Sequence, residues 1–267
     1  MIIVGERLNS SRKVVLEALQ TKDADYLCSQ ALAQEKAKAA YIDLNVAAMM
    51  EKEIDTLLWA IPFLQRAVKA PLALDTPNPD AMEAALKVHQ GRALVNSLSD
   101  DSTSLEALVP LIRRYRPRVI ALCLNKEGPP ESANMAVSRA QKMADILQSA
   151  GLHPEDIFID PLVRPIAVDH KSGTVFLESV ARIKSSLPGI RTIAGVSNVS
   201  FGLPQRRLLN RTLLILAMSK GLDAAICDPL DGDVQASLAA SEALLGQDPS
   251  LKKYLSYIRE QAKKSGA

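Results

Sequence analysis

The fold of this chain is decided by the stretch Leu72-Ala73-Leu74-Asp75-Thr76-Pro77-Asn78-Pro79. Its three apolar residues are typical of a short strand that is buried on both faces. Asn78 is a good helix cap, and Pro79 suits the first position of the helix that follows. Gly91 then ends a predicted helix over Asp80–Gln90. The stretch therefore predicts a strand, a turn and a helix in succession.

The same alternation of a short apolar run and an amphipathic stretch recurs along the whole sequence. Gly151 follows a predicted helix over Ala133–Ala150, and Gly221 follows one over Leu208–Lys220. Eight strand–helix units are therefore predicted. Their strands are Ile2–Val4, Tyr41–Leu44, Leu72–Leu74, Ala93–Val95, Val119–Leu124, Ile157–Ile159, Thr192–Val196 and Ala224–Ile226.

Eight such units can close into a barrel or remain an open doubly wound sheet. An open sheet usually has a glycine-rich nucleotide-binding turn after its first strand, whereas this chain reads Gly5-Glu6-Arg7-Leu8-Asn9 there. A length of 267 residues fits a single α/β barrel. We therefore expect one (β/α)8 barrel over residues 1–247, with a C-terminal helix and tail over residues 248–267 in the same domain.

Charge and composition argue against several classes of protein. The 32 basic and 30 acidic residues are spread along the chain, which gives no basic surface for nucleic acid or membranes. Residues Met1–Arg7 do not resemble a signal peptide and no run is long enough to span a bilayer, so we expect a cytoplasmic protein. Cys28, Cys123 and Cys227 are too far apart to indicate a disulfide framework or a zinc site. The three histidines, which we interpret as surface or packing residues, are His89, His153 and His170.

An acid or amide side chain follows almost every predicted strand. In a parallel barrel the carboxyl ends of all strands meet at one mouth, where enzymes of this fold build their active sites. Asp and Asn also cap helices and occupy turns, and for any single position that interpretation is equally good. Their repetition at successive strands favours a site. The residues are Glu6, Asn9, Asp43, Asn45, Asp75, Asn96, Asn125, Asp160, Asn198 and Asp228.

A mouth of acids and amides with few cations suits a neutral heterocycle that carries several hydrogen-bond donors, and it suits a phosphate poorly. A carboxylate accepts two neighbouring donors, and a carboxamide pairs with a donor and an acceptor at once. The candidates for this recognition are Asp75, Asn96 and Asp160, which follow the third, fourth and sixth strands.

Seven short motifs, in this order and spacing, resemble those of the pterin-binding methyltransferases. That family includes the methyltetrahydrofolate:corrinoid methyltransferases and the folate domain of cobalamin-dependent methionine synthase. The resemblance covers nearly the whole chain. Its motifs are Gly5-Glu6-Arg7-Leu8-Asn9, Asp43-Leu44-Asn45, Leu74-Asp75-Thr76, Asn96-Ser97, Ile159-Asp160-Pro161-Leu162, Gly195-Val196-Ser197-Asn198-Val199-Ser200 and Asn210-Arg211-Thr212.

The resemblance implies a role for several of these residues. Asp75, Asn96 and Asp160 are expected to bind the pterin. Asn198 is expected near N5, the nitrogen that carries the methyl group, and Arg206 close to the folate. Arg207 can reach the glutamate tail of the folate, and at Phe201 some relatives have a polar residue instead. Four more residues are candidates for orienting the pterin-binding side chains by hydrogen bonds: Glu6, Asn9, Asp43 and Asn45.

The chemistry of N5 supports the role of Asn198. A tertiary amine is a poor leaving group, so removal of its methyl group requires a proton or a strong hydrogen bond at N5. The carboxamide of Asn198 cannot supply the proton, which can come from water. Its N–H group can stabilise the developing charge, and its oxygen can accept a hydrogen bond from a protonated N5.

The expected activity is methyl transfer between N5 of tetrahydrofolate and the cobalt of a corrinoid. The sequence contains no Asp-x-His-x-x-Gly motif, so the corrinoid is expected on a partner protein, and we expect no metal of the chain's own. The family implies a homodimer, to which the apolar stretch Leu57–Leu64 can contribute unless it only packs on the barrel. The direction of transfer is left open.

Two alternatives remain beside this expectation. A dihydropteroate synthase is another pterin-binding barrel, but the chain lacks the Arg-x-His that such enzymes carry after the last strand. The acidic stretch Cys227–Asp233 at that place is expected to repel pyrophosphate. The other alternative is a folate-binding barrel without catalysis, which would have no need of a donor at N5. A zinc-dependent thiol methyltransferase is disfavoured because a His/Cys ligand set is missing.

Overall fold

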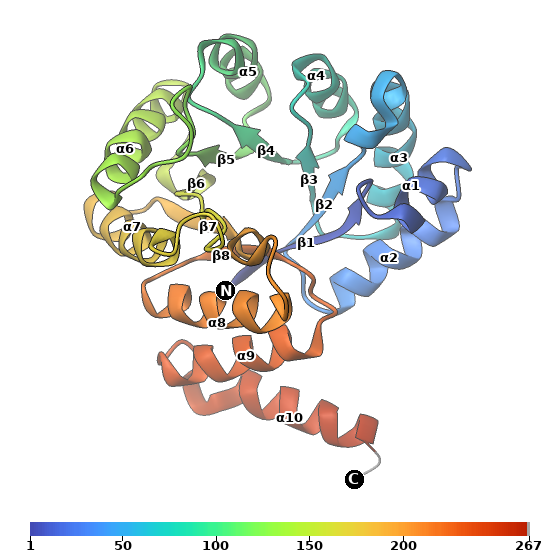
Figure 1. Cartoon of the computed structure of the whole chain (residues 1–267). Coiled ribbons are helices and arrows are strands. Elements are labelled where there is room, and N and C mark those ends of the chain that lie inside the picture. Colours follow the sequence, from blue (N-terminus) through green and yellow to red (C-terminus); the bar gives the residue numbers. More distant parts are fainter. Residues whose placement is uncertain (266–267) are drawn as a thin grey trace.

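The computed structural model describes residues 1–265, which form a closed barrel of eight parallel strands in the order of the sequence. Figure 1 shows the strands surrounded by helices. The prediction of a single (β/α)8 barrel is confirmed. The strands are β1 (Ile2–Asn9), β2 (Tyr41–Asn45), β3 (Leu72–Asp75), β4 (Leu94–Leu98), β5 (Arg118–Leu122), β6 (Ile157–Asp160), β7 (Arg191–Gly195) and β8 (Ala224–Cys227).

At least one helix follows every strand, and a further helix packs on the last of them. In Figure 1 that final helix, α10, lies outside α9, and the hydroxyl of Tyr257 in α10 donates to the carbonyl of Gly232, 3.2 Å away. The helices are α1 (Lys13–Gln20), α2 (Ala24–Lys36), α3 (Glu53–Ala67), α4 (Pro79–Val88), α5 (Ser102–Tyr115), α6 (Ala133–Ser149), α7 (Ser172–Ser186), α8 (Arg206–Ser219), α9 (Gly232–Leu244) and α10 (Lys252–Ser265). Residues 266 and 267 of the predicted tail lie outside the described residues.

The strand–helix unit around β3 has the structure that its sequence predicts, apart from the end of its helix. The side chain of Asn78 accepts from the backbone of Asp80 and caps α4, with Pro79 in the first turn. The predicted end at Gln90 is wrong, because α4 ends at Val88. Gln65 of α3 binds both backbone groups of Gln90, at 2.8 and 2.9 Å, and so holds these residues outside the helix.

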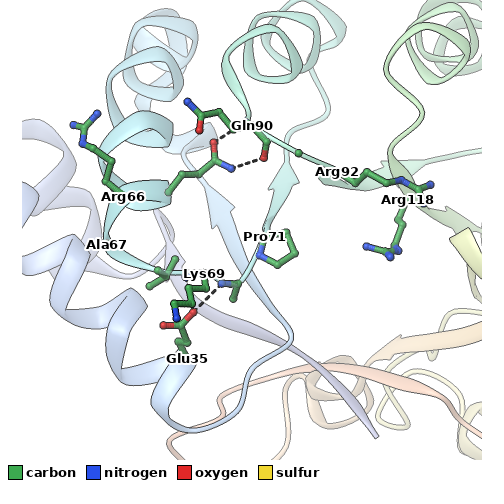
Figure 2. Close-up of a pocket in the computed structure, with 12 residues that line it drawn as sticks. Glu35, Arg66, Ala67, Lys69, Pro71, Gln90, Arg92 and Arg118 are labelled. Atoms are coloured by element: carbon green, nitrogen blue, oxygen red, sulfur yellow. Dashed lines mark hydrogen bonds between the residues drawn. The ribbon is translucent and has the colours of Figure 1, made fainter.

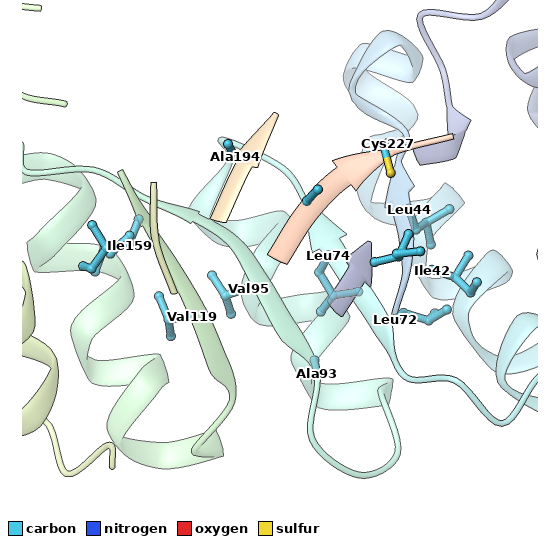
Figure 3. Packing of buried hydrophobic residues seen from close by; sticks show 14 of the residues in the cluster. Ile42, Leu44, Leu72, Leu74, Ala93, Val95, Val119, Ile159, Ala194 and Cys227 are labelled. Carbon is cyan, nitrogen blue, oxygen red and sulfur yellow. The ribbon is translucent and has the colours of Figure 1, made fainter. Parts of the chain in front are cut away.

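Apolar side chains fill two layers of the barrel. The larger core lies between the strands and the surrounding helices, and Figure 3 shows part of it around β2, β3, β4 and β5. The second core fills the barrel itself with one buried side chain from each strand, and it closes the interior below the mouth. Its members are Val4, Tyr41, Ala73, Leu94, Ile120, Phe158, Ile193 and Ala224.

The apolar stretch Leu57–Leu64 belongs to the larger core. Leu57, Ile61 and Leu64 are fully buried on the face of α3 that contacts the barrel. Packing on the barrel therefore accounts for these three residues, whereas Leu58 is 38% exposed. No helix within residues 1–265 is both long and apolar enough to cross a bilayer.

Candidate active site

The mouth of the barrel is lined by the side chains two positions after the buried interior layer. Successive side chains of a strand point to opposite faces, so this spacing returns the side chain to the interior. Strands β1, β2, β3, β4 and β6 contribute polar groups, and the other three strands contribute none. The polar members are Glu6, Asp43, Asp75, Asn96 and Asp160, and the others are Leu122, Gly195 and Ile226.

The first ordered pair in the mouth is Asp75 with Asn45. The amide nitrogen of Asn45 donates to Asp75 Oδ2 at 2.9 Å, and the hydroxyl of Ser10 donates to Asn45 Oδ1, also at 2.9 Å. The second carboxylate oxygen of Asp75 has no hydrogen-bond partner among residues 1–265. Ser10 and Asn45 therefore orient Asp75 and leave one of its oxygens for a ligand donor.

The second ordered pair is Asn96 with Asp43. Asn96 lies beside Asp75 in the sheet, and its amide nitrogen donates to Asp43 Oδ1 at 3.1 Å. Asp43 is buried, and its pKa is raised well above the usual range, first by that burial and then by the charge of Asp75. The bond to Asp43 fixes the amide of Asn96, whose oxygen has no partner in the described part of the chain.

Asp160 is the buried carboxyl at the end of β6. Its Oδ1 accepts from the backbone amide of Leu162 at 2.8 Å. Burial raises the pKa of Asp160 to about 7, against the lowering effect of hydrogen bonds from the backbone amides of Leu162 and Gly195. Burial also raises the pKa values of Asp75 and Glu6. The raised pKa values mean that the protein itself stabilises the ionised carboxylates only in part. Hydrogen-bond donors of a bound ligand would stabilise the ionised form further.

Asn198 lies in the short 3-10 helix η3 (Val196–Ser200), which directly follows β7. It is exposed, and its amide nitrogen lies over the backbone of Gly195, where an added Cβ would be 3.5 Å away. Because Gly195 has no side chain, the carboxamide of Asn198 has room at the edge of the mouth. The predicted position of Asn198 beside the pterin ligands is therefore sterically open.

Arg206, the first residue of α8, binds the loop that carries Asn198. Its Nε donates to the hydroxyl of Ser200 at 3.1 Å, and its Nη2 donates to the carbonyl of Ser197 at 3.0 Å. The guanidinium also lies 5.9 Å from the centre of the Phe201 ring. Arg207 is 89% exposed, with Nε 3.9 Å from Asp231 Oδ2. The loop therefore occupies much of the hydrogen-bonding capacity of Arg206.

Other strand-end residues have mainly local roles. The side chain of Asn9 accepts from the backbone of Ser11, and that of Asn125 accepts from the backbone of Glu127, which is the turn-forming role that Asn often plays. Glu6 has a raised pKa and no hydrogen bond in the described residues. Of the four residues expected to orient the pterin-binding side chains, Asp43 and Asn45 thus form hydrogen bonds with them.

The acidic stretch after β8 does not form an unbalanced negative surface. Arg7 Nη1 lies 2.7 Å from Asp228 Oδ2, and Arg211 Nη1 lies 2.8 Å from Asp233 Oδ2. Together with Arg207 near Asp231, these arginines offset the charge that was expected to repel pyrophosphate. The acidic stretch alone therefore does not separate the two classes of enzyme, and the missing Arg-x-His motif is the sequence feature that does.

Two further contacts near the mouth have no signal in the local sequence. The buried carboxylate of Glu53 accepts from the hydroxyl of Thr76 at 2.6 Å, and so fixes the loop that follows Asp75. Arg139 is buried and donates to the carbonyls of Cys123 and Gly128, which holds the loop after β5. Both contacts join residues more than ten positions apart.

The histidines have the roles expected of surface and packing residues. His89 is buried and contacts Gln65, whereas His153 and His170 are exposed. Residues 1–265 contain no group of three or more His, Cys, Asp or Glu side chains that could hold a metal ion.

Two cavities lie away from the mouth, one of about 690 Å³ at the opposite end of β3–β5 and one of about 530 Å³ between α2 and α9.

A parallel barrel with acids and amides at its mouth is an architecture of enzymes that bind pterins, and comparison with known proteins agrees. The model of the family "Pterin binding enzyme" matches residues 5–228. The chain belongs to this family.

Two relatives narrow the comparison within the family. The chain is 33% identical to the methylcorrinoid:tetrahydrofolate methyltransferase of Eubacterium limosum over 262 residues, which cover 97% of each chain. It is 27% identical to the methionine synthase of Mycobacterium tuberculosis over 239 residues, which cover 85% of this chain and 20% of the synthase.

Solved structures of dihydropteroate synthases share the fold. The enzyme of Yersinia pestis matches with a TM-score of 0.69 and 15% identity, over 92% of this chain and 93% of that chain. The enzyme of Xanthomonas albilineans in complex with 7,8-dihydropteroate matches with a TM-score of 0.63 and 19% identity, over 83% and 85%. At these identities the likeness concerns the barrel alone.

Proposed function

We propose that this protein is a methyltransferase that moves a methyl group between N5 of tetrahydrofolate and the cobalt of a corrinoid protein. The observation that carries the proposal is the 33% identity, over 97% of both chains, to an enzyme named for these two substrates. The mouth supports it, since its free oxygens suit a ligand edge rich in donors. The similarity to a methionine synthase further supports the proposal.

The pterin edge is bound, in this proposal, by Asp75, Asn96 and Asp160. Asp75 and Asn96 are neighbours in register on adjacent strands, and each is held from behind by another side chain. Their free oxygens, with the second oxygen of Asp160, accept from the 2-amino group and the ring N–H of the pterin. Because these acceptors are fixed before binding, little side-chain freedom is lost when the ligand enters.

Asn198 serves the reacting nitrogen. Its place above Gly195 leaves its carboxamide next to the mouth, where the N–H group can stabilise the charge that develops on N5 as the carbon–nitrogen bond breaks. In the reverse direction the same group orients N5 as it attacks the methyl carbon. Both directions use the same contacts, and Arg206 holds the loop in place.

The corrinoid partner supplies the cobalt that gives or takes the methyl group, and it must reach N5 through the open mouth. Large apolar side chains are exposed on the loops after β6, β7 and β8: Val168 is 80% exposed, Phe201 67% and Leu230 40%. In our proposal these loops receive the partner.

Further parts of the proposal rest on the family for the dimer, and on the sequence for the location, the metal and the domain bounds. The protein works as a homodimer in the cytoplasm, carries no metal of its own, and includes residues 248–267 in the same domain as the barrel of residues 1–247. Sedimentation analysis at several protein concentrations tests the dimer, and a monomer at all concentrations would refute it.

The activity is tested by incubating the protein with methylcob(III)alamin and tetrahydrofolate and measuring methyltetrahydrofolate. Wild type is expected to form it, and Asn198→Ala is expected to lose about 100-fold in kcat, the usual cost of removing a donor that stabilises developing charge. Tetrahydrofolate affinity of the variant should stay within about threefold of wild type. Full activity in the variant excludes the role at N5. Wild type that binds tetrahydrofolate without turnover supports the non-catalytic alternative.

A further inference from the structure

The cavity at the end of the barrel opposite the mouth is a second site with its own chemistry. It has a volume of about 690 Å³, within the range of about 300–1,000 Å³ that is typical of small-ligand pockets. Its walls come from the ends of α2 and α3 and from the segments that lead into β3, β4 and β5. Figure 2 shows Arg92 beside Arg118 on one side of this cavity, and Lys69 beside Glu35 on the other.

The walls carry more positive than negative charge. Arg66, Lys69, Arg92 and Arg118 line the cavity, whereas Glu35 is the carboxylate among its lining residues. Both backbone amides of the turn at Lys69 and Ala70 donate to Glu35 Oε1, at 2.6 and 2.7 Å. Glu35 therefore serves the turn between α3 and β3. The ammonium of Lys69 forms no ion pair or hydrogen bond within residues 1–265.

A buried carboxylate beneath the cavity orders the two arginines. Arg92 Nη2 lies 2.8 Å from Asp156 Oδ2, and Arg118 Nε lies 3.4 Å from Asp156 Oδ1. The contact of Arg118 is an ion pair whose geometry falls short of a hydrogen bond. Arg92 also donates through Nε to the backbone carbonyl of Arg116. The two guanidiniums are thus held side by side, and the terminal nitrogens of Arg118 have no partner among the described residues.

Two fixed guanidiniums with an ammonium across the cavity are typical of a site that binds phosphoryl groups. Asp156 pairs with Arg92 and Arg118, and Glu35 serves the turn at Lys69. Figure 2 shows the side chain of Arg66 pointing away from the other three cations, so Lys69, Arg92 and Arg118 are the cations that border the cavity. Guanidiniums match the oxygens of phosphoryl groups in pairs, and a second charged group fixes a second phosphoryl group. The mouth has the opposite character, because carboxyls and carboxamides line it.

We propose that this basal cavity binds a small oxyanion with at least two negative charges, of the pyrophosphate class, at a site separate from the mouth. Arg92 and Arg118 hold one phosphoryl group, and Lys69 contacts the other. The proposal does not depend on the methyltransferase activity, because the cavity lies at the amino ends of the strands and the mouth lies at their carboxyl ends.

The test is titration of the whole protein with sodium pyrophosphate by calorimetry and by thermal unfolding, against sodium chloride of equal ionic strength. A stoichiometric isotherm is expected, with a Tm increase of about 5 °C at a hundredfold excess over Kd. Binding should persist when the mouth is saturated with tetrahydrofolate, which separates the two sites. Lys69→Gln should weaken binding about tenfold, because one charge-assisted contact is lost.

Two further variants control the result. Lys87→Gln removes a cation of α4 that pairs with Glu83 and does not line the cavity, and it should bind as wild type does. Arg92→Lys keeps the charge but loses the planar guanidinium that contacts both Asp156 and the carbonyl of Arg116, and it should weaken binding while far-UV circular dichroism stays unchanged. The proposal is overturned if pyrophosphate acts no differently from chloride. It is also overturned if tetrahydrofolate displaces pyrophosphate, or if Lys69→Gln and Lys87→Gln both bind like wild type.

Discussion

The two sides of the mouth differ in what their strands contribute. On β1, β2, β3 and β4 the side chain that faces the mouth is polar on every strand, and on β2, β3 and β4 these side chains are hydrogen-bonded to further side chains. On β5, β7 and β8 the corresponding residues are Leu122, Gly195 and Ile226. Only Asp160 on β6 interrupts the apolar side.

In the function that we propose, this difference separates pterin recognition from methyl transfer. The polar side is rigid, because strand residues hold one another, and it suits a fixed contact with the pterin edge. The apolar side has its polar groups on loops, with Asn198 above Gly195, and its rim carries the exposed Val168 and Phe201. Substitutions on the polar side should therefore change ligand affinity, and those in the β7 loop should change the rate.

The largest effect on the polar side is expected for Asp75→Asn. The change keeps the size but removes the charge, and it places an N–H group where a ligand donor must be accepted, so tetrahydrofolate should bind about 100-fold more weakly. Calorimetric titration measures this. Leu122→Ala on the apolar side is the matched control, and its affinity should stay within about threefold. Equal losses in the two variants would contradict the division.

A pH titration of affinity examines the one acid on the apolar side. The pKa of Asp160 is raised to about 7, so below that pH the free protein holds this carboxyl protonated. Ligand donors favour the ionised form, so binding releases a proton below pH 7. Affinity should fall about tenfold for each unit of pH below 7 and level off above it. Asp160→Asn should flatten the profile, apart from a residual slope due to Asp75 and Glu6.

A smaller effect is expected for Arg206→Gln. Loss of the contacts to Ser197 and Ser200 frees the loop that carries Asn198, so kcat should fall about fivefold with little change in tetrahydrofolate affinity. Steady-state rates and equilibrium binding are measured on the same preparation. If affinity falls while kcat holds, Arg206 contacts the folate directly, as the family resemblance implies.

The smallest effect belongs to Gly195→Ala. The new Cβ would lie 3.5 Å from the amide nitrogen of Asn198, an ordinary contact that restricts the side chain without expelling it. We expect kcat to fall by about twofold to threefold, with unchanged stability and affinity. Gly202→Ala is not a suitable control, because Gly202 has a φ of +80° and resists substitution for that reason alone. Ala194→Gly, on the outer face of β7, tests whether any change in this strand has the same effect.

The barrel and the polar strand ends could be predicted because their signals are local. A run of three apolar residues, the acid that ends it and a cap at Asn78 all lie within one short segment. The strand-end positions of Asp75, Asn96 and Asp160 follow from the place where each apolar run ends. Asn45 and Asp43, the side-chain partners of Asp75 and Asn96, also follow a predicted strand and are among the sequence candidates.

The remaining contacts could not be predicted, because they join distant segments or depend on how a turn folds. Arg7 pairs with Asp228 across 221 positions, and the sequence near either residue contains no sign of the other. The hydrogen bonds of Arg206 depend on how the chain turns between Ser200 and α8. Asn9 and Asn125 look the same in sequence as the residues of the mouth network, but they form turns.

The buried apolar layer beneath the mouth has a consequence for the protons of the reaction. Tyr41, Phe158 and Ile193 belong to a floor in which no side chain is more than 5% exposed, so water enters and leaves the chamber only from above. When a partner covers the opening, the number of protons inside is fixed for that turnover. The pH of the medium then sets the protonation state of the mouth carboxyls before the partner docks. It has no further effect during the transfer itself.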